Sequence, residues 1–275
     1  GLGDVYKRQP VEVRPKKLSV TEIKTLIRDP YAIYAKHILR LRPLDPLRPE
    51  ADPRLRGIVL HEILENFVAR QGAGVDDLLR IADEVLASRV AWPLARAVWR
   101  ARIGKAAQAF LDFSASTGGQ PVLTETKGAA SLAGQDFTLT GKPDRIDRLA
   151  DGRLLLIDYK TGDPPTEKQQ AHFDKQLLLT AAMAENGAFP DLGPVEVAQI
   201  VFVGVKAEMK IVKTDLQPGQ VAEVWADFAK LIAAYARPSQ GYTARRAMKV
   251  ERDVSDYDHL SRFGEWDMTR AGGGE

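Results

Sequence analysis

The 275-residue chain contains no cysteine. This absence excludes disulfides, cysteine-ligated zinc sites and thiolate-ligated iron–sulfur clusters, and it fits a reducing compartment, so we expect a cytoplasmic protein. No apolar run approaches the roughly 18 residues that a membrane-spanning helix needs, so no membrane partner is expected. The net charge is only +2, so any contact with nucleic acid would need a local basic patch rather than a generally basic surface.

Apolar residues make up 44% of the chain, which is enough for a core. Helical patterns fill residues 18–116, starting with a capping-box pair at Ser19 and Glu22 and broken by the proline-rich connector 42–53. The later part predicts helices over 166–187 and 219–236 and strands at 121–134, 137–150, 153–160, 195–205 and 208–215. This order predicts an α/β fold, with a central mixed β-sheet flanked by helices and an N-terminal helical region.

The two ends of the chain stand apart from this pattern. The first nine residues, GLGDVYKRQ, look like translated sequencing adapter, so we expect residues 1–9 to be a non-native leader and the natural protein to continue upstream. Residues 10–240 are predicted to form one domain, helical over 18–116 and sheet-containing over 121–236. Residues 241–275 are predicted to be a C-terminal tail, whose basic cluster is either solvated or in contact with DNA phosphates: Arg245, Arg246, Lys249 and Arg252.

The stretch LLLIDYKTG, residues 154–162, leads a buried apolar run directly into an acid and a lysine. An ADG turn before it predicts a hairpin with the preceding PDRID stretch. A two-residue loop would point Asp144 away from Asp158. A three-residue loop, with Gly152 in the left-handed conformation, would place Asp144 directly opposite Asp158, with Lys160 on the same face.

Two carboxylates that face each other on a sheet repel unless a cation lies between them. Mg²⁺, which prefers carboxylate oxygens and water, is the natural candidate, and a neighbouring lysine can neutralise negative charge developing on a phosphate. The alternative is that these groups are simply solvated, because acids and lysines at strand ends usually are. An aspartate two residues before a lysine is a weak pattern by itself.

The neighbouring stretches make the set more specific. In order, GIVLHEILE, GKPDRID, LLLIDYKTG and QLLL together resemble the RecB-like branch of the PD-(D/E)XK nucleases, from Leu18 to about Gln240. The opening DPYAIYAKHILRLRPLDPL and the ending YDHLSRFGEWD look more narrowly like the C-terminal nuclease domain of an AddB-type protein. Such proteins are parts of bacterial helicase–nuclease machines that resect DNA double-strand breaks.

The resemblance implies roles for individual residues. Asp144 and Asp158 match the metal-binding acids, and Lys160 matches the catalytic lysine. The backbone carbonyl of Tyr159 and the helix histidine His61 match further metal ligands. The implied cofactor is Mg²⁺ or Mn²⁺, and the implied partners are DNA and an AddA-type helicase–nuclease protein.

One further match and two departures concern the same resemblance. Gln176 matches the glutamine of the family's Q-x-x-x-Y element, which shapes the site and contacts DNA, but Thr180 stands in place of its tyrosine. Many AddB-type nucleases hold an iron–sulfur cluster with four cysteines, the first just before a proline. Here Asp29 precedes Pro30, so no cluster is expected, and the helices that it would join are expected to be held by packing alone.

Other candidates carry weaker signals. Taken alone, His61 beside an apolar helix face is more often a packed histidine, and Glu65, one turn later, either orients it or faces solvent. Glu125, on a predicted strand before Asp144, is a candidate accessory acid, although surface exposure is the favoured interpretation. Strand alternation directs Asp147 to the face opposite Asp144. The remaining histidines show no ligand spacing: His37, His172 and His259.

Two functions follow from these patterns. The first is a metal-dependent DNA nuclease, of exonuclease type, in a complex that resects double-strand breaks. The second is a catalytically silent nuclease-fold module that binds DNA or scaffolds a helicase partner. Loss of any of Asp144, Asp158 or Lys160 would have favoured the silent module, and all three are present. A nucleotide-binding motor lacks support, because the chain contains no G-x-x-x-x-G-K-[ST] stretch.

Overall fold

The computed structural model describes residues 10–44, 50–166, 169–170, 175–244 and 255–261, so the leader, His172 and the basic cluster of the tail lie outside the described residues. Its centre is a five-stranded sheet in the order β2-β5-β6-β7-β8. All neighbouring strands are antiparallel except β6 and β7, which are parallel. The strands are β2 Gln120–Thr124, β5 Arg145–Arg148, β6 Leu154–Lys160, β7 Val197–Gly204 and β8 Lys210–Asp215.

Strand β6 lies in the middle of this sheet and is buried up to its last residue. Each residue from Leu154 to Ile157 is at most 2% exposed, and Asp158 is 3% exposed. A central strand that is covered on both faces has a continuous apolar sequence rather than an alternating one. The LLLI run is therefore the core strand itself, and it carries the acid of residue 158 into the interior.

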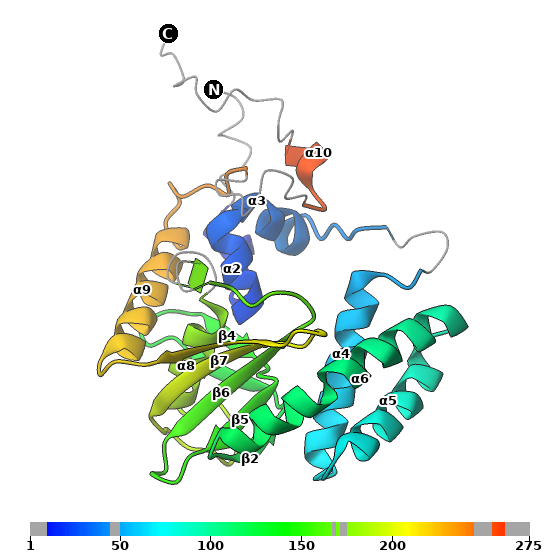
Figure 1. The fold of residues 1–275 in the computed structure, drawn as a ribbon. Helices are drawn as coiled ribbons and strands as arrows, with labels where there is room; N and C mark the ends of the chain where they lie inside the picture. Colours follow the sequence, from blue (N-terminus) through cyan, green and yellow to red (C-terminus); the bar gives the residue numbers. More distant parts are fainter. Residues whose placement is uncertain (1–9, 45–49, 167–168, 171–174, 245–254, 262–275) are drawn as a thin grey trace.

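Three helices cover one face of the sheet: α4 Pro53–Ala69, α5 Val75–Arg89 and α6 Pro93–Ser116 (Figure 1). Helix α4 begins where the proline-rich connector ends, with the Asp52 side chain accepting a hydrogen bond from Leu55 N at 2.7 Å. Leu155, Ile157 and Tyr159 of β6 pack against these helices. This packing fixes the position of α4 relative to the end of β6.

The opposite face is covered by α2 Val20–Arg28, α8 Gln176–Glu185 and α9 Gln220–Tyr235 (Figure 1). A second sheet, of order β1-β4-β3, joins the same core. Its strands are β1 Lys17–Ser19, β3 Gly128–Ser131 and β4 Thr138–Gly141. Helix α8 lies on the connection between the parallel strands β6 and β7, which brings its first turn close to the end of β6.

The predicted α/β fold, with mixed sheet and flanking helices, is confirmed, but two predicted strands are each divided. The 121–134 stretch becomes β2 and β3, and the 137–150 stretch becomes β4 and β5. The first break follows Glu125, whose φ is +47°, and the second contains Pro143, which has no N–H for a strand ladder. The breaks allow β3 and β4 to leave for the second sheet while β2 and β5 stay in the first.

The described ends of the chain pack together beside α2. Arg14, after the short 3₁₀ turn η1 Val11–Val13, donates a hydrogen bond to the Tyr235 carbonyl at the end of α9. Tyr242 and Tyr257, both beyond residue 240, are buried in the core that contains α2 and α8. Three short helices complete this region: α3 Pro30–Ile33, the π-helix η2 Tyr34–Ile38, and α10 Asp258–Ser261.

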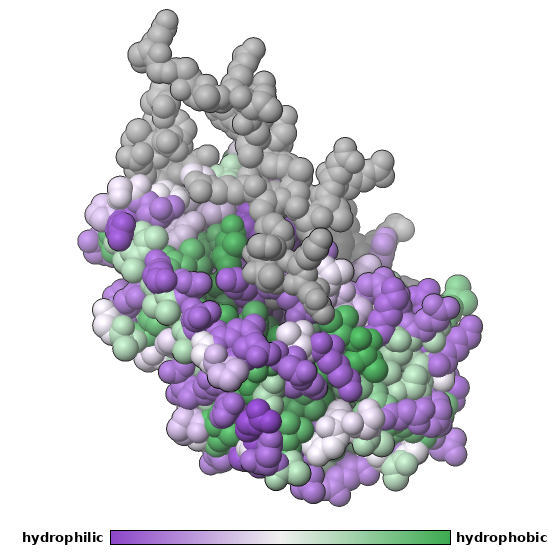
Figure 2. Space-filling model, turned by 60° about the vertical axis from the view of Figure 1, so that its left-hand side comes forward, coloured by the Kyte–Doolittle hydropathy of each residue, from purple (hydrophilic) through white to green (hydrophobic). Residues whose placement is uncertain are grey.

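The surface in Figure 2 mixes hydrophilic and apolar residues, and hydrophilic residues occupy much of that face. Among the described residues, none of the helices combines the length and apolar character needed to cross a membrane.

The start of α2 has the predicted capping box. Ser19 N donates to Glu22 Oε2 at 2.9 Å, and Glu22 N donates to Ser19 Oγ at 3.3 Å. Lys36 and His37 contact Glu22 Oε1 at 2.7 and 2.8 Å, which ties α2 to η2. Burial alone would raise the pKa of Glu22, but these contacts outweigh it and lower this pKa to about 2.

We expect Glu22→Gln to lower the free energy of unfolding by about 1 kcal/mol at pH 7. Because the folded pKa is depressed, this stabilisation is present above the unfolded pKa and disappears as pH falls towards about 2. Denaturant unfolding of both proteins across this pH range measures the difference. The control is Glu223→Gln in the first turn of α9, where the side chain is exposed. A difference that does not shrink with falling pH would contradict this role of the Glu22 charge.

Candidate active site

The end of β6 presents an acid and a lysine on the face covered by α8. Asp158 Oδ2 lies 2.6 Å from Lys160 Nζ, and Asp158 Oδ1 accepts a hydrogen bond from Gln176 Nε2 at 3.1 Å. Gln176 is the first residue of α8. The side chain of Asp158 is only 4% exposed, whereas that of Lys160 is 31% exposed, so the pair runs from the interior to the surface.

The β5–β6 hairpin brings Asp144 to the same place. Strand β5 pairs Arg145 with Ile157, so the register extended by one step puts Asp144 opposite Asp158. The loop is the three-residue one, because Leu149 N donates to Arg153 O and Gly152 has φ +88°. Asp144 Oδ2 accepts a hydrogen bond from Tyr159 N at 2.6 Å, which fixes this carboxylate at the end of β6.

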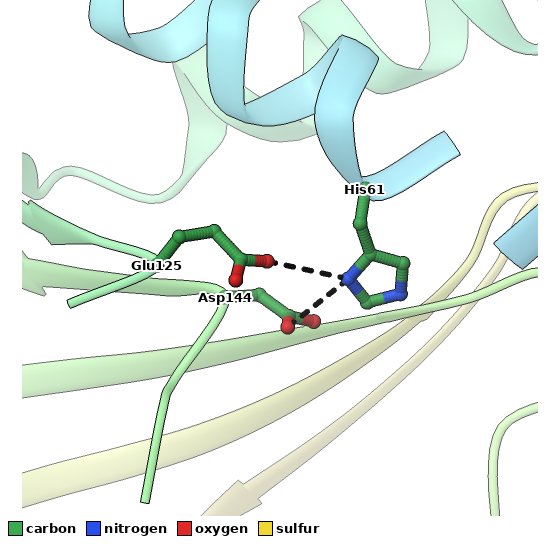
Figure 3. A group of neighbouring side chains, drawn as sticks. All are labelled: His61, Glu125 and Asp144. Atoms are coloured by element: carbon green, nitrogen blue, oxygen red, sulfur yellow. Dashed lines mark hydrogen bonds and ion pairs between the residues drawn. The ribbon is translucent and has the colours of Figure 1, made fainter. Parts of the chain in front are cut away.

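His61 reaches the Asp144 carboxylate from α4. Its Nδ1 lies 3.1 Å from Asp144 Oδ1 and 3.6 Å from Glu125 Oε1, as the dashed lines in Figure 3 show. Ligand atoms of these three residues all lie within 4.8 Å of one another, the spacing of a metal-binding group. Leu60 and Leu64 are buried beside this histidine, so the apolar face of α4 aims the ring at the strands.

Glu125 corrects the sequence interpretation that favoured surface exposure. Its side chain is only 12% exposed and forms an ion pair with Lys142 besides facing His61. Burial alone would raise the pKa of Glu125, but His61 and Lys142 outweigh it and lower this pKa. Thr124 pairs with Arg145, so the residue after β2 meets the residue before β5. That pairing between two separate strands is the missing signal, because the sequence predicts one strand that continues past Glu125.

Burial and opposite charges together set the electrostatics. Burial by itself lowers the pKa of His61, but the bonds to Asp144 and Glu125 outweigh it and raise this pKa to about 10. Burial raises the pKa of Asp158; the ammonium of Lys160 opposes this rise, and the negative charge of Asp144 adds to it. Asp144 and Asp158 therefore feel each other's charge, which is the condition that favours a bound cation.

The donor set fits a divalent cation. Carboxylate oxygens are the preferred ligands of Mg²⁺ and Mn²⁺, and imidazole is a general metal ligand. In the described part of the chain, the buried Asp158 Oδ2 accepts no hydrogen bond and is balanced by its ion pair with Lys160. His61, Glu125 and Asp144 offer the compact group, and Asp158 borders it across the β5–β6 register.

This geometry is accompanied by a match to one protein family. The family description of the PD-(D/E)XK nuclease superfamily matches residues 17–258. The chain belongs to this superfamily.

Relatives among curated proteins are more distant. An uncharacterized protein of Rickettsia bellii is 34% identical over 188 residues, which are 63% of this chain and 22% of that protein. An uncharacterized protein of Rickettsia felis is 30% identical over 211 residues, 70% of this chain and 24% of that protein. An ATP-dependent helicase/deoxyribonuclease protein of Streptococcus agalactiae is 26% identical over 171 residues, 58% of this chain and 15% of that protein. The chain thus spans less than a quarter of the length of each of these relatives.

The other residues singled out in this superfamily member have structural surroundings of their own. Thr180, in the place of the family tyrosine, is buried and donates to the Gln176 carbonyl, one turn back on α8. Glu65 is half-buried and, among the described residues, makes no hydrogen bond to His61. Burial and the nearby Glu125 raise the pKa of Glu65. His37 bonds to Glu22, far from the acids in sequence, and belongs to the α2 capping network.

Asp147 lies on the opposite face of β5, as alternation predicts. Arg145 Nε and Nη2 donate to its two carboxylate oxygens at 2.6 and 2.7 Å, and both side chains are almost fully buried. Arg145 Nη1 also donates to Ser114 Oγ of α6 at 2.8 Å. This pair joins β5 to the helical face and so supports the strand that carries Asp144.

We expect Asp147→Asn to lower the free energy of unfolding by about 3–5 kcal/mol, because it leaves the Arg145 charge buried without a counter-charge. Chemical denaturation followed by circular dichroism measures the loss. The matched control is Asp151→Asn, whose partner Arg153 is at the surface and whose unfolding midpoint should hardly change. Equal midpoints for the two variants would show that the buried pair does not hold β5.

Proposed function

We propose that this chain is a metal-dependent DNA nuclease domain of a helicase–nuclease complex that resects DNA double-strand breaks. The observation that carries the proposal is the meeting of His61, Glu125 and Asp144 with the Asp158–Lys160 pair at the end of β6. Membership of the nuclease superfamily supports hydrolysis of phosphodiester bonds. The helicase/deoxyribonuclease relative supports a helicase partner of AddA type, an AddB-like place in the complex and an exonuclease mode of cleavage.

The residues that would hold Mg²⁺ or Mn²⁺ are Asp144, Asp158 and His61, with Glu125 added by the structure and the Tyr159 carbonyl implied by the family resemblance. When bound, such an ion acidifies a water molecule and stabilises the negative charge of the phosphate.

The chain's own groups then divide the remaining work. Lys160 extends from the buried Asp158 towards the surface, so its ammonium can approach a phosphate at the mouth of the site. A positive donor placed where charge develops typically contributes about 10²–10³ in rate. Gln176 orients the Asp158 carboxylate through its side-chain amide. Glu125 and Asp144 hold the His61 ring between them.

The second candidate function is a silent module that binds DNA or scaffolds the helicase partner. The whole acid and lysine set is present and spatially connected, and a silent module has no need of it. Metal binding and turnover therefore separate the two functions.

We expect Lys160→Ala to keep most metal affinity and to lose about 10²–10³ in cleavage rate, because it removes a charge donor but no metal ligand. Asp144→Ala and Asp158→Ala should lose both metal binding and cleavage. Calorimetry with Mg²⁺ or Mn²⁺ measures binding, and degradation of linear DNA measures turnover, with and without a helicase partner. Lys213→Ala, an exposed strand lysine of β8, is the matched control. Wild-type cleavage by Lys160→Ala, or normal metal binding by Asp158→Ala, would show that these roles are wrong.

The structure adds an expectation for Glu125. Glu125→Gln keeps the shape of the side chain but removes the charge from the compact group, so metal affinity should fall by about tenfold or more. Glu65→Gln is the matched control, because Glu65 is a neighbouring acid outside that group. Calorimetric titration without DNA isolates the effect from catalysis. If both variants bind metal alike, Glu125 only neutralises Lys142 and His61.

A further inference from the structure

A cavity of about 390 Å³ lies next to the proposed active site, between α4, α6 and the turn that joins β7 to β8. Trp99 and Ile103 of α6 and Val59 and Leu60 of α4 give it an apolar wall. Its volume falls within the roughly 300–1,000 Å³ of small-molecule pockets, so a flat ring system fits inside.

The rim of this cavity is cationic. Arg56, Arg102 and Lys206 line it together with a single acid, Glu208. Lys206 pairs with Asp163 at 2.5 Å, whereas Arg56 and Arg102 have no ion-pair partner among the described residues. The Nε of Arg56 is buried and has no hydrogen-bond partner in the described part of the chain. An apolar interior with unneutralised arginines at its edge is complementary to an aromatic ligand that carries phosphates.

Two chain connections place this cavity beside the acids. Leu60 in its wall directly precedes His61 on α4, and Thr161 in its lining directly follows Lys160 on β6. Val205, also in the lining, donates its backbone N–H to the Lys160 carbonyl at 2.7 Å. A ligand in the cavity is therefore one residue away, along two separate elements, from groups of the proposed active site.

We propose that this cavity receives an unpaired nucleobase of the DNA strand that is being cleaved. The proposal rests on the proposed function, which brings a DNA phosphate to Lys160. The apolar wall accepts the base, and Arg56 and Arg102 contact the flanking phosphates. A base that is paired and stacked in a duplex cannot enter without being extruded, so the cavity selects single-stranded DNA.

The test uses the full chain in metal-free buffer with a single-stranded oligonucleotide and with the blunt duplex of the same sequence. Fluorescence anisotropy measures affinity, and 2-aminopurine placed at successive positions reports which base enters an apolar environment. Arg102→Glu removes a rim cation, and Ala207→Trp narrows the cavity from the exposed β7–β8 turn. Lys105→Glu is the matched control, because Lys105 is an exposed cation of α6 outside the lining.

We expect the wild type to favour the single strand and to change 2-aminopurine emission at one position only. Arg102→Glu and Ala207→Trp should each weaken single-strand binding by about tenfold and abolish that signal, with little effect from Lys105→Glu. Unchanged binding by Ala207→Trp, equal losses for the two charge reversals, or no single-strand binding by the wild type would overturn the proposal. Unchanged binding would instead favour an apolar side chain of a partner protein as the occupant, since Leu94 and Val98 are exposed on the same helix.

Cleavage is assayed separately with Mg²⁺, so the two proposals fail in different ways. A chain that binds the single strand through the cavity but does not cleave it sinks the proposed function alone. A chain that cleaves DNA while Arg102→Glu and Ala207→Trp bind normally sinks the base-binding cavity alone.

Discussion

The antiparallel register of β5 and β6 is the constraint on which the site depends. Because side chains alternate between faces, a slip of one residue would move Asp144 to the helical face, where Tyr159 packs. Two features hold the register from its two sides. Gly152, at φ +88°, closes the three-residue loop at one end, and the buried Arg145–Asp147 pair anchors the other face of β5 against α6. A slipped β5 would leave that arginine without its counter-charge in the core, which is costly.

Every carboxylate of the site faces a cation supplied by the chain itself. Glu125 faces Lys142, Asp144 faces His61, and Asp158 faces Lys160. Burying an unpaired carboxylate would cost several kcal/mol, so these pairs allow three acids to gather at the end of a core strand. The same pairs explain the opposed pKa shifts, because each cation stabilises the charged form that burial disfavours. The chain therefore keeps an acidic cluster and a folded core together, and the acids remain available to a stronger cation.

Much of this arrangement could be predicted from the sequence, because it depends on local rules. The apolar run 154–157, the ADG turn and the two-residue spacing of Asp158 and Lys160 are enough to derive the register and the shared face. Periodicity also locates α4 and directs His61 towards the strands. Glu125 escapes this reasoning, because its place depends on the pairing of β2 with β5 across an intervening excursion of the chain through the second sheet. The cavity escapes it for the same reason: its lining comes from helices and a turn that are distant in sequence.

The seam between the two ends of the chain shows how the fold closes without thiolates. Where related nucleases are expected to have a cluster cysteine, the Asp29 carboxylate accepts hydrogen bonds from Ala32 N at 3.3 Å and from Ser255 Oγ at 2.8 Å. Tyr31 N donates to Thr243 O, and Tyr257 Oη donates to Leu41 O, so polar bonds cross the seam where packing alone was expected. Each such bond contributes only about 1 kcal/mol, and the burial of Tyr257 and Tyr242 adds to their sum. Because the seam is a sum of small terms with no thiolate among them, its integrity depends neither on iron nor on redox state.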